Sequence, residues 1–177
     1  FADPRQIDRL GAQLASLQAI DARSTPALAR LDPVALARGY VRRIVAAAPE
    51  EQRHLAPLLT AAERRWRDSG AFARSPFLGT ALFPFCLAAL ADPLHDVACV
   101  LAYHPEAGPN LPRLLAALGL ERVATPAVLD AAIWLFQLLV FLWYRARRVA
   151  VAASTAEQAA EERAARALVS LVHNRSL

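Results

Sequence analysis

The residues best suited to bind a metal ion are Glu51 and His54, which form an E-x-x-H pattern. On a helix, residues three positions apart lie on one face, and di-iron carboxylate bundles present two ligands in this way. Such a site needs a second E-x-x-H and two further inward glutamates, and the chain contains no second copy of the pattern. The sequence therefore predicts no metal site.

A second group of chemically capable residues follows Asp92-Pro93. His95 and Cys99 lie one helical turn apart, a spacing that suits a metal or a thiolate–imidazole pair. A core histidine beside a buried thiol has the same pattern, and this interpretation is favoured. A ligand pocket between helices is kept as an alternative, with the candidate residues Phe83, Phe85, His95, Cys99 and His104.

The order of features over residues 94–134 resembles the second half of a globin: a histidine, a short loop, an "LL" helix and a long helix that opens at Thr-Pro. The resemblance implies a haem iron bound by His95 or His104. The helix at Leu114 is short, no distal His or Gln is evident, and a further helix follows. We therefore assign no family and predict no cofactor, and a haem- or small-molecule-binding sensor domain remains an alternative.

Catalytic motifs are absent from the sequence. It contains no G-x-S-x-G, H-E-x-x-H, C-x-x-C or phosphate-binding glycine loop. The two cysteines, Cys86 and Cys99, suit a reducing compartment, and the polar opening segment does not have the pattern of a signal peptide. We expect a cytoplasmic protein that is not an enzyme, with an N-terminus that was trimmed before Phe1.

All 20 basic residues are arginine, which together with the many Ala, Leu, Val and Pro residues indicates GC-rich coding of a bacterial type. A formal charge of +4 is small for a nucleic-acid-binding protein. The arginines cluster at 42–43, 64–67 and 145–148. We predict that these clusters are solvated helix ends, where cations complement the helix dipole, and that the protein does not bind nucleic acid.

Six pairs of a capping residue followed by proline predict helix starts, because the side chain accepts from free first-turn amides and proline has no N–H to satisfy. They are Asp3-Pro4, Thr25-Pro26, Asp32-Pro33, Ser75-Pro76, Asp92-Pro93 and Thr125-Pro126. Helices are predicted at 4–20, 33–47, 50–68, 76–91, 93–103, 110–118, 126–152 and 155–173. Helix stops are predicted at Gly70 and Gly119, a capping box at Ser154 and Glu157, and kinks at Pro57 and Pro84.

These elements predict an all-α fold without strands. At 177 residues the chain fits one domain, 1–177, an irregular bundle of about eight helices around the apolar helix at 126–152. Between Arg74 and Arg113 the chain has no basic residue, so a buried helical hairpin that turns at Asp92-Pro93 is expected there.

The run from Ala131 to Tyr144 is apolar except for Gln137. Its 14 residues reach about 21 Å, less than the roughly 30 Å hydrocarbon core of a bilayer. A helix buried in protein is therefore favoured, and a peripheral membrane protein anchored through 127–144 is the second alternative.

The leading prediction is a helical interaction module, such as an adaptor, scaffold or regulatory subunit, that contacts a protein partner or forms a homo-oligomer. Its predicted interaction surface comprises Trp134, Phe136, Leu138, Phe141, Trp143, Arg145, Arg147 and Arg148.

Overall fold

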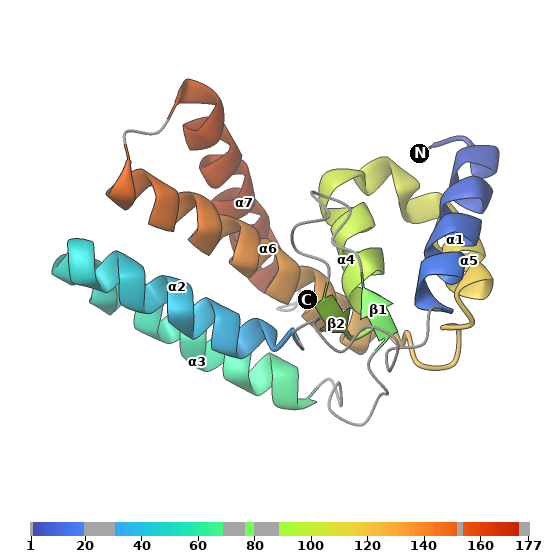
Figure 1. Ribbon diagram of the computed structural model, residues 1–177, viewed down its shortest axis with the longest axis horizontal. Coiled ribbons are helices and arrows are strands. Elements are labelled where there is room, and N and C mark those ends of the chain that lie inside the picture. The colour runs from blue at the N-terminus through green and yellow to red at the C-terminus, as the bar shows by residue number, and fades with distance from the viewer. Residues whose placement is uncertain (1, 20–30, 69–76, 80–88, 152–153, 174–177) are drawn as a thin grey trace. The chain divides into compact units, whose positions relative to one another are not determined.

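The computed structural model describes residues 2–19, 31–68, 77–79, 89–151 and 154–173 (Figure 1). Apart from one short two-stranded ribbon, the regular elements among these residues are helical. In chain order they are α1 (Pro4–Gln18), α2 (Pro33–Ala47), the 3₁₀ turn η2 (Pro49–Glu51), α3 (Gln52–Asp68), β1 (Phe77–Gly79), β2 (Ala89–Ala91), α4 (Leu94–Tyr103), the 3₁₀ turn η5 (Pro105–Asn110), α5 (Leu111–Ala117), α6 (Pro126–Ala150) and α7 (Thr155–His173).

The all-α class is thus confirmed, whereas the bundle of eight helices is not. The described residues contain seven α-helices, and the helix predicted at 76–91 is replaced at both of its ends by β1 and β2. These strands pair antiparallel, with Leu78 opposite Leu90. Short apolar segments of Ala, Leu and Phe fit a helix or a strand equally well, so pattern alone could not separate them. Pro84 and Gly70 lie outside the described residues.

The chain divides into two compact units, residues 1–31 with 69–133, and residues 32–68 with 134–177. We call them unit 1 and unit 2. Helix α6 runs through both, because its first eight residues belong to unit 1 and the rest to unit 2. The single domain expected from the length therefore contains two units, each with its own hydrophobic core.

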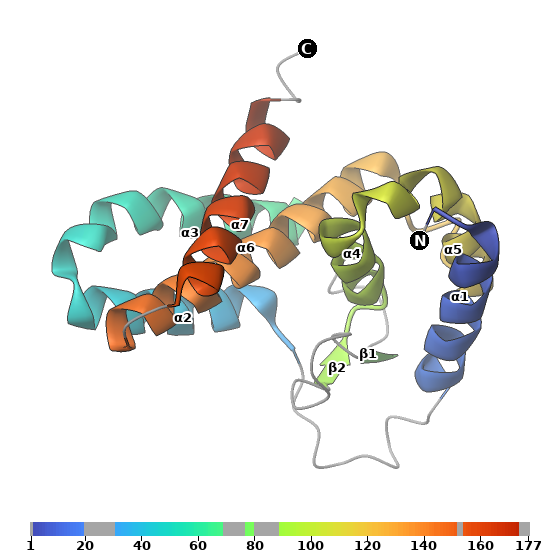
Figure 2. The same cartoon turned by 90° about the horizontal axis from the view of Figure 1, so that it is seen from above.

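Unit 1 is built on the pairing of α1 with α5, which lie side by side in both views (Figures 1 and 2). The stripe Ile7, Leu10 and Leu14 is buried at the spacing of one helix face. Between these residues, Gly11 lets the helices approach closely: a Cβ atom built at this position would lie 2.7 Å from the Cβ of Ala117.

Unit 2 is built on the α2–α3 hairpin, which turns at η2 (Figure 2). Val41 and Ile44 of α2 share a buried core with Trp134, Leu138 and Leu142 of α6. Helix α7 folds back after α6 and adds Leu168 to this core. In these helices the buried residues recur with the period of an amphipathic helix. Burial of one face therefore stabilises each helix.

The helix starts predicted at Asp3-Pro4, Asp32-Pro33 and Thr125-Pro126 are confirmed, and α4 begins at Leu94, one residue after the start predicted at Asp92-Pro93. Asp3, Asp32 and Asp92 accept hydrogen bonds from backbone N–H groups two residues on at 2.9 Å, and Thr125 accepts one from Val128 at 3.4 Å. Thr25-Pro26 and Ser75-Pro76 lie outside the described residues. These caps fix where α1, α2, α4 and α6 begin.

Two further local predictions are confirmed. Gly119 ends α5 with a φ of 65°, and the amide of Ser154 donates to Glu157 at 3.0 Å while the amide of Glu157 donates back to the Ser154 hydroxyl at 3.3 Å. Pro57, where the sequence predicts a kink or a split, does not split the helix, because α3 continues through it. Its ring lies at an exposed position.

Helix α6 is the one helix in the described ranges that is long and apolar enough to span a membrane, and half of its most apolar window is buried within the protein. At 25 residues it is longer than the uncharged run on which the length estimate rested. Length alone therefore does not exclude a membrane span.

Candidate functional site

A cluster of apolar and aromatic side chains, of which Trp143, Arg147 and Val151 are exposed and Val140 and Tyr144 half-buried, lies at the C-terminal half of α6. We call it the Trp143 face, and it comprises Val140, Trp143, Tyr144, Arg147 and Val151. Trp143 is 37% exposed and Val151, directly after the helix, is 67% exposed. Few large side chains on the described surface are this accessible, and Trp, Tyr and Arg are the residues most often dominant in protein interfaces.

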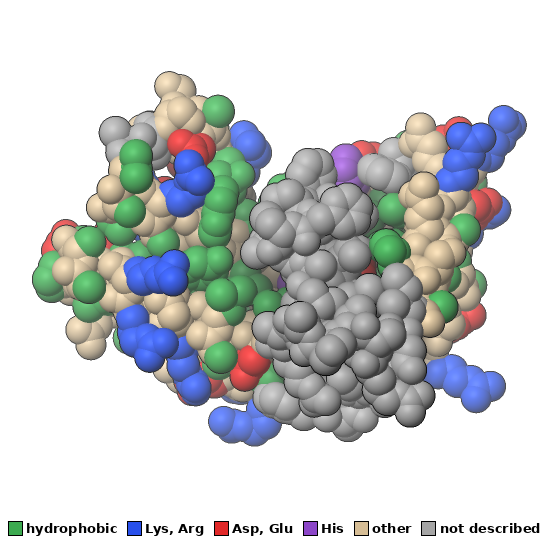
Figure 3. Space-filling model, viewed as in Figure 1, with side chains coloured by type: hydrophobic (Ala, Val, Ile, Leu, Met, Phe, Trp, Pro, Cys, Tyr) green, Lys and Arg blue, Asp and Glu red, His purple; other side chains and the backbone are tan. Residues whose placement is uncertain are grey.

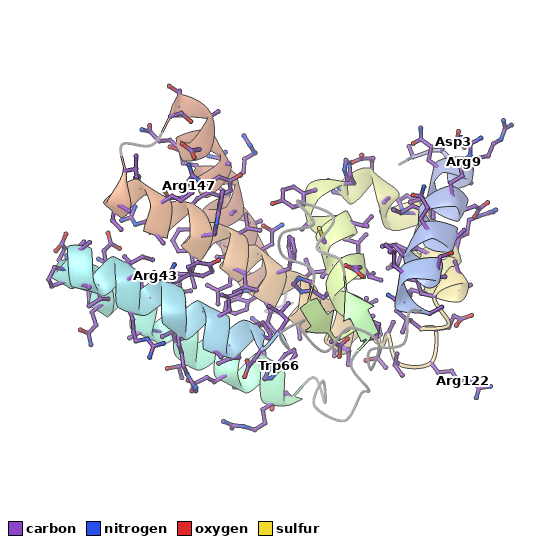
Figure 4. The ribbon with its side chains drawn as sticks, in the orientation of Figure 1. Asp3, Arg9, Arg43, Trp66, Arg122 and Arg147 are labelled. Carbon is purple, nitrogen blue, oxygen red and sulfur yellow. The ribbon has the colours of Figure 1, made fainter. Side chains whose placement is uncertain are left out.

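The Trp143 face is held in a fixed arrangement by its own contacts. The rings of Trp143 and Tyr144 meet edge to face, with centroids 4.6 Å apart. The guanidinium of Arg147 lies 5.1 Å from the centroid of the Trp143 ring and forms an ion pair with Glu157 of α7 at 2.8 Å (Figure 4). This face is therefore ordered before any partner binds, which lowers the entropic cost of association.

Glu157 joins the Trp143 face to the start of α7. Its pKa is lowered chiefly by the hydrogen bond from the Ser154 amide, then by the Ser154 hydroxyl and by Arg147. The same carboxylate thus caps α7 and positions the guanidinium that covers Trp143.

The spacing along α6 is that of a helix–helix seam. Phe136, Val140, Trp143, Arg147 and Ala150 alternate in steps of four and three residues, as in the contact line of packed helices. Phe136 is buried, Val140 is half-buried, and the last three are exposed. The C-terminal part of this seam is therefore open to another helix.

A buried ionic cluster lies on the other side of α6. Arg145 donates to Glu161 of α7 at 3.0 Å and forms a second ion pair with Glu51 of η2. The side chains of Arg145, Glu51 and Glu161 are only 19%, 16% and 7% exposed. Burial raises the pKa of Glu161, and Arg145 opposes that rise. One guanidinium thus connects η2, α6 and α7.

The ionic cluster forms one end of an open groove between α3, α6 and α7, with a volume of about 470 Å³. Its apolar walls come from Leu55, Leu58, Phe141 and Ala165. Glu51 and His54, the E-x-x-H pair, both line this groove. The cation that Glu51 and Glu161 share is Arg145. Within the described ranges, no three His, Cys, Asp or Glu side chains are placed to hold a metal ion.

The residues of the alternative ligand pocket are placed as follows. Cys99 is buried in α4, and His95 is half-buried beside it. Burial lowers the pKa of His95 to about 4, so its imidazole is neutral near physiological pH. His104, at the end of α4, lies 3.0 Å from the carboxylate of Glu106. Phe83 and Phe85 lie outside the described residues.

The predicted interaction surface is divided between the interior and the surface. Trp134, Phe136 and Leu138 are at most 7% exposed. Phe141, Arg145 and Arg148 line the groove, while Trp143 and Arg147 belong to the Trp143 face. Within the predicted interaction surface, Trp143 and Arg147 are therefore the residues whose side chains are exposed outside the groove.

Two arginines contradict the prediction that the arginine clusters are solvated helix ends. Arg145 is part-buried in the ionic cluster, with 19% of its side chain exposed, and the guanidinium of Arg65 lies 4.6 Å from the centroid of the buried Trp134 ring. An arginine can be placed inside when carboxylates or an aromatic face receive its charge.

Sequence reasoning missed Glu161, although a signal for it exists. Glu161, Ala164 and Leu168 share one helix face, and all three are buried. A carboxylate on an apolar stripe indicates a buried ion pair, because a lone buried charge is too costly.

Comparison with family models, with curated proteins and with solved structures finds no match to this chain.

Proposed function

We propose that this chain is a non-enzymatic assembly module that binds a second copy of itself through the Trp143 face. The observation that carries the proposal is the pre-ordered cluster of Trp143, Tyr144 and Arg147, in which Trp143 and Arg147 are exposed. Burial of such aromatic surface is a main source of binding free energy in protein interfaces.

A second copy is favoured as the partner because the face is self-complementary. In a two-fold contact the same patch of each copy meets its equivalent on the other copy. A charged side chain without a counter-ion would therefore face the same charge on the other copy and be repelled. Here the one charged side chain of the face, Arg147, is already paired with Glu157 of its own chain. Two copies can therefore pack Val140, Trp143 and Ala150 against each other without burying an unbalanced charge.

The test is the molar mass in solution, measured by light scattering over a concentration series. We expect the wild type to form a dimer and Trp143→Asp to be a monomer, because a carboxylate at the centre would be desolvated without a partner. Val151→Asp, at a 67% exposed position, should weaken the dimer without disturbing the core. Circular dichroism checks that both variants remain folded.

The matched control is Val123→Asp, because Val123 is 38% exposed, as Trp143 is 37% exposed, but lies in unit 1. This variant should remain a dimer. A wild type that stays monomeric up to about 1 mM, where a contact of about 4 kcal/mol would be half-formed, contradicts self-assembly.

A further inference from the structure

The excess positive charge of the chain is concentrated in unit 2. By sequence, unit 2 contains thirteen arginines and eight carboxylates, whereas unit 1 contains seven arginines and eight carboxylates. The formal charges are therefore +5 and −1. The concentration of positive charge in one unit indicates that the charge has a local role, since solubility alone does not require such segregation.

Most carboxylates of unit 2 already have partners within the unit. Glu51 and Glu161 bind Arg145, Glu157 caps α7 and binds Arg147, Glu63 binds Arg38, and Asp32 caps α2. They stabilise the fold and leave much of the arginine charge on the surface unbalanced.

Arginine side chains are exposed over the α2–α3 hairpin (Figure 3), and four of them lie at positions outside the core side chains of the two helices. We call this surface the arginine face, and its members are Arg38, Arg42, Arg64 and Arg67. Arg42, Arg64 and Arg67 have no carboxylate partner among the described residues, whereas Arg38 has Glu63.

The arginine face already holds one carboxylate. Arg38 donates to the same Glu63 oxygen from Nε at 3.1 Å and from Nη2 at 2.7 Å. Arg38 and Arg42 are one helical turn apart, as are Arg64 and Arg67. These two rows match carboxylates that repeat once per turn along a partner segment.

We propose that the arginine face docks an acidic polypeptide segment, one rich in Asp and Glu, from another protein. The face offers guanidinium groups that suit carboxylates. The two aromatic side chains that alternate with its arginines, Tyr40 and Trp66, are half-buried against the core of unit 2, which favours carboxylates over stacked nucleobases. This surface lies on α2 and α3 and shares no residue with the Trp143 face, so the inference goes beyond the self-assembly proposed above.

The probe is a fluorescein-labelled peptide of glutamate–alanine repeats, titrated with the full chain at low salt and followed by fluorescence anisotropy. We expect saturable binding that weakens as salt is added. The triple variant Arg42→Ala, Arg64→Ala and Arg67→Ala should bind about tenfold more weakly or worse, since it loses three charge pairs.

The matched control removes three exposed arginines from unit 1, Arg5, Arg9 and Arg122, and so has the same net charge as the triple variant. Arg9 and Arg122 are labelled in Figure 4. It should bind the peptide as the wild type does. All six substituted positions are exposed, and tryptophan fluorescence confirms that unit 2 is folded in both variants.

Equal loss of peptide binding in the two triple variants would show that net charge alone acts, and would overturn the proposal. The proposal would also be overturned if the wild type did not bind the peptide. The same holds if the wild type preferred a random-sequence DNA duplex, or vesicles that contain phosphatidylserine, to the peptide. Trp143→Asp should retain peptide binding, so failure of self-assembly and failure of the arginine face are read separately.

Discussion

Replacing Arg145 by methionine tests whether the buried ionic cluster holds unit 2 together. Methionine keeps an unbranched apolar chain in place of the arginine stem but removes the guanidinium. Glu161 and Glu51 then lose the cation that they share between α7 and η2. We expect the free energy of unfolding of unit 2 to fall, because these carboxylates stay largely buried in the folded state.

The size of the effect follows from the burial of the cluster. With the Glu161 side chain 7% exposed and that of Glu51 16% exposed, little water can replace the lost charge. Removing one partner of a buried ion pair costs about 3–5 kcal/mol. Arg166→Met provides the contrast, since Arg166 is 70% exposed and lies 3.7 Å from Glu162. Loss of such a surface pair should change stability by less than about 1 kcal/mol.

The assay is urea unfolding followed by tryptophan fluorescence. All three tryptophans, Trp66, Trp134 and Trp143, belong to unit 2, so their emission reports on this unit. Far-ultraviolet circular dichroism of the same samples reports on both units. A shift of the fluorescence transition to lower urea in Arg145→Met, larger than any shift in Arg166→Met, is the expected result.

The pH dependence gives a second readout. Burial already raises the pKa of Glu161, and loss of Arg145 removes the group that opposes this rise. A carboxyl whose folded-state pKa lies above its unfolded value destabilises the fold when ionised, and this cost disappears as the pH falls below the folded-state pKa. The stability deficit of Arg145→Met should therefore shrink between neutral and mildly acidic pH. A deficit below about 1 kcal/mol, or one that does not change with pH, would refute the reasoning.

Four further substitutions test the packing and the caps. Gly11→Ala should destabilise unit 1 by about 1–3 kcal/mol through the clash with Ala117, whereas Gly39→Ala, with no atom within 4 Å, should stabilise unit 2 by about 0.5–1 kcal/mol; thermal unfolding followed by circular dichroism separates the two signs. Ser154→Ala removes half of the capping box and should lower the free energy of unfolding in urea by about 1 kcal/mol. An unchanged urea midpoint would contradict this prediction. Leu138→Asp, at a position with 0% exposure, should unfold unit 2, and a native fluorescence spectrum for this variant would show that the core is assigned incorrectly.

The helices and their starts could be predicted from the sequence because their causes are local. Asp32-Pro33 and Thr125-Pro126 begin α2 and α6 through hydrogen bonds to amides two or three residues away. Gly119 ends α5 because a positive φ costs glycine little. Each of these signals acts within a few residues and needs no knowledge of the rest of the chain.

The pairing of side chains far apart in the sequence could not be predicted, and it decides the candidate site. From the sequence alone, Glu51 was only a candidate metal ligand without the further ligands that a site needs, and Arg145 was predicted to lie at a solvated helix end. The fold brings Glu51, Arg145 and Glu161 together across separations of 94 and 16 residues, and makes them one another's counter-ions.

Tertiary structure also decided which parts of the apolar helix are accessible. The sequence shows that residues 131–144 are apolar. It does not distinguish Trp134 from Trp143, because the two side chains are identical and lie in the same apolar run. In the structure Trp134 is 1% exposed and Trp143 is 37% exposed, because α2 and α3 share a core with one side of α6 and leave the other side open. A hydrophobic pattern determines that a face must be covered, whereas the packing of distant helices determines which side chains are left for a partner.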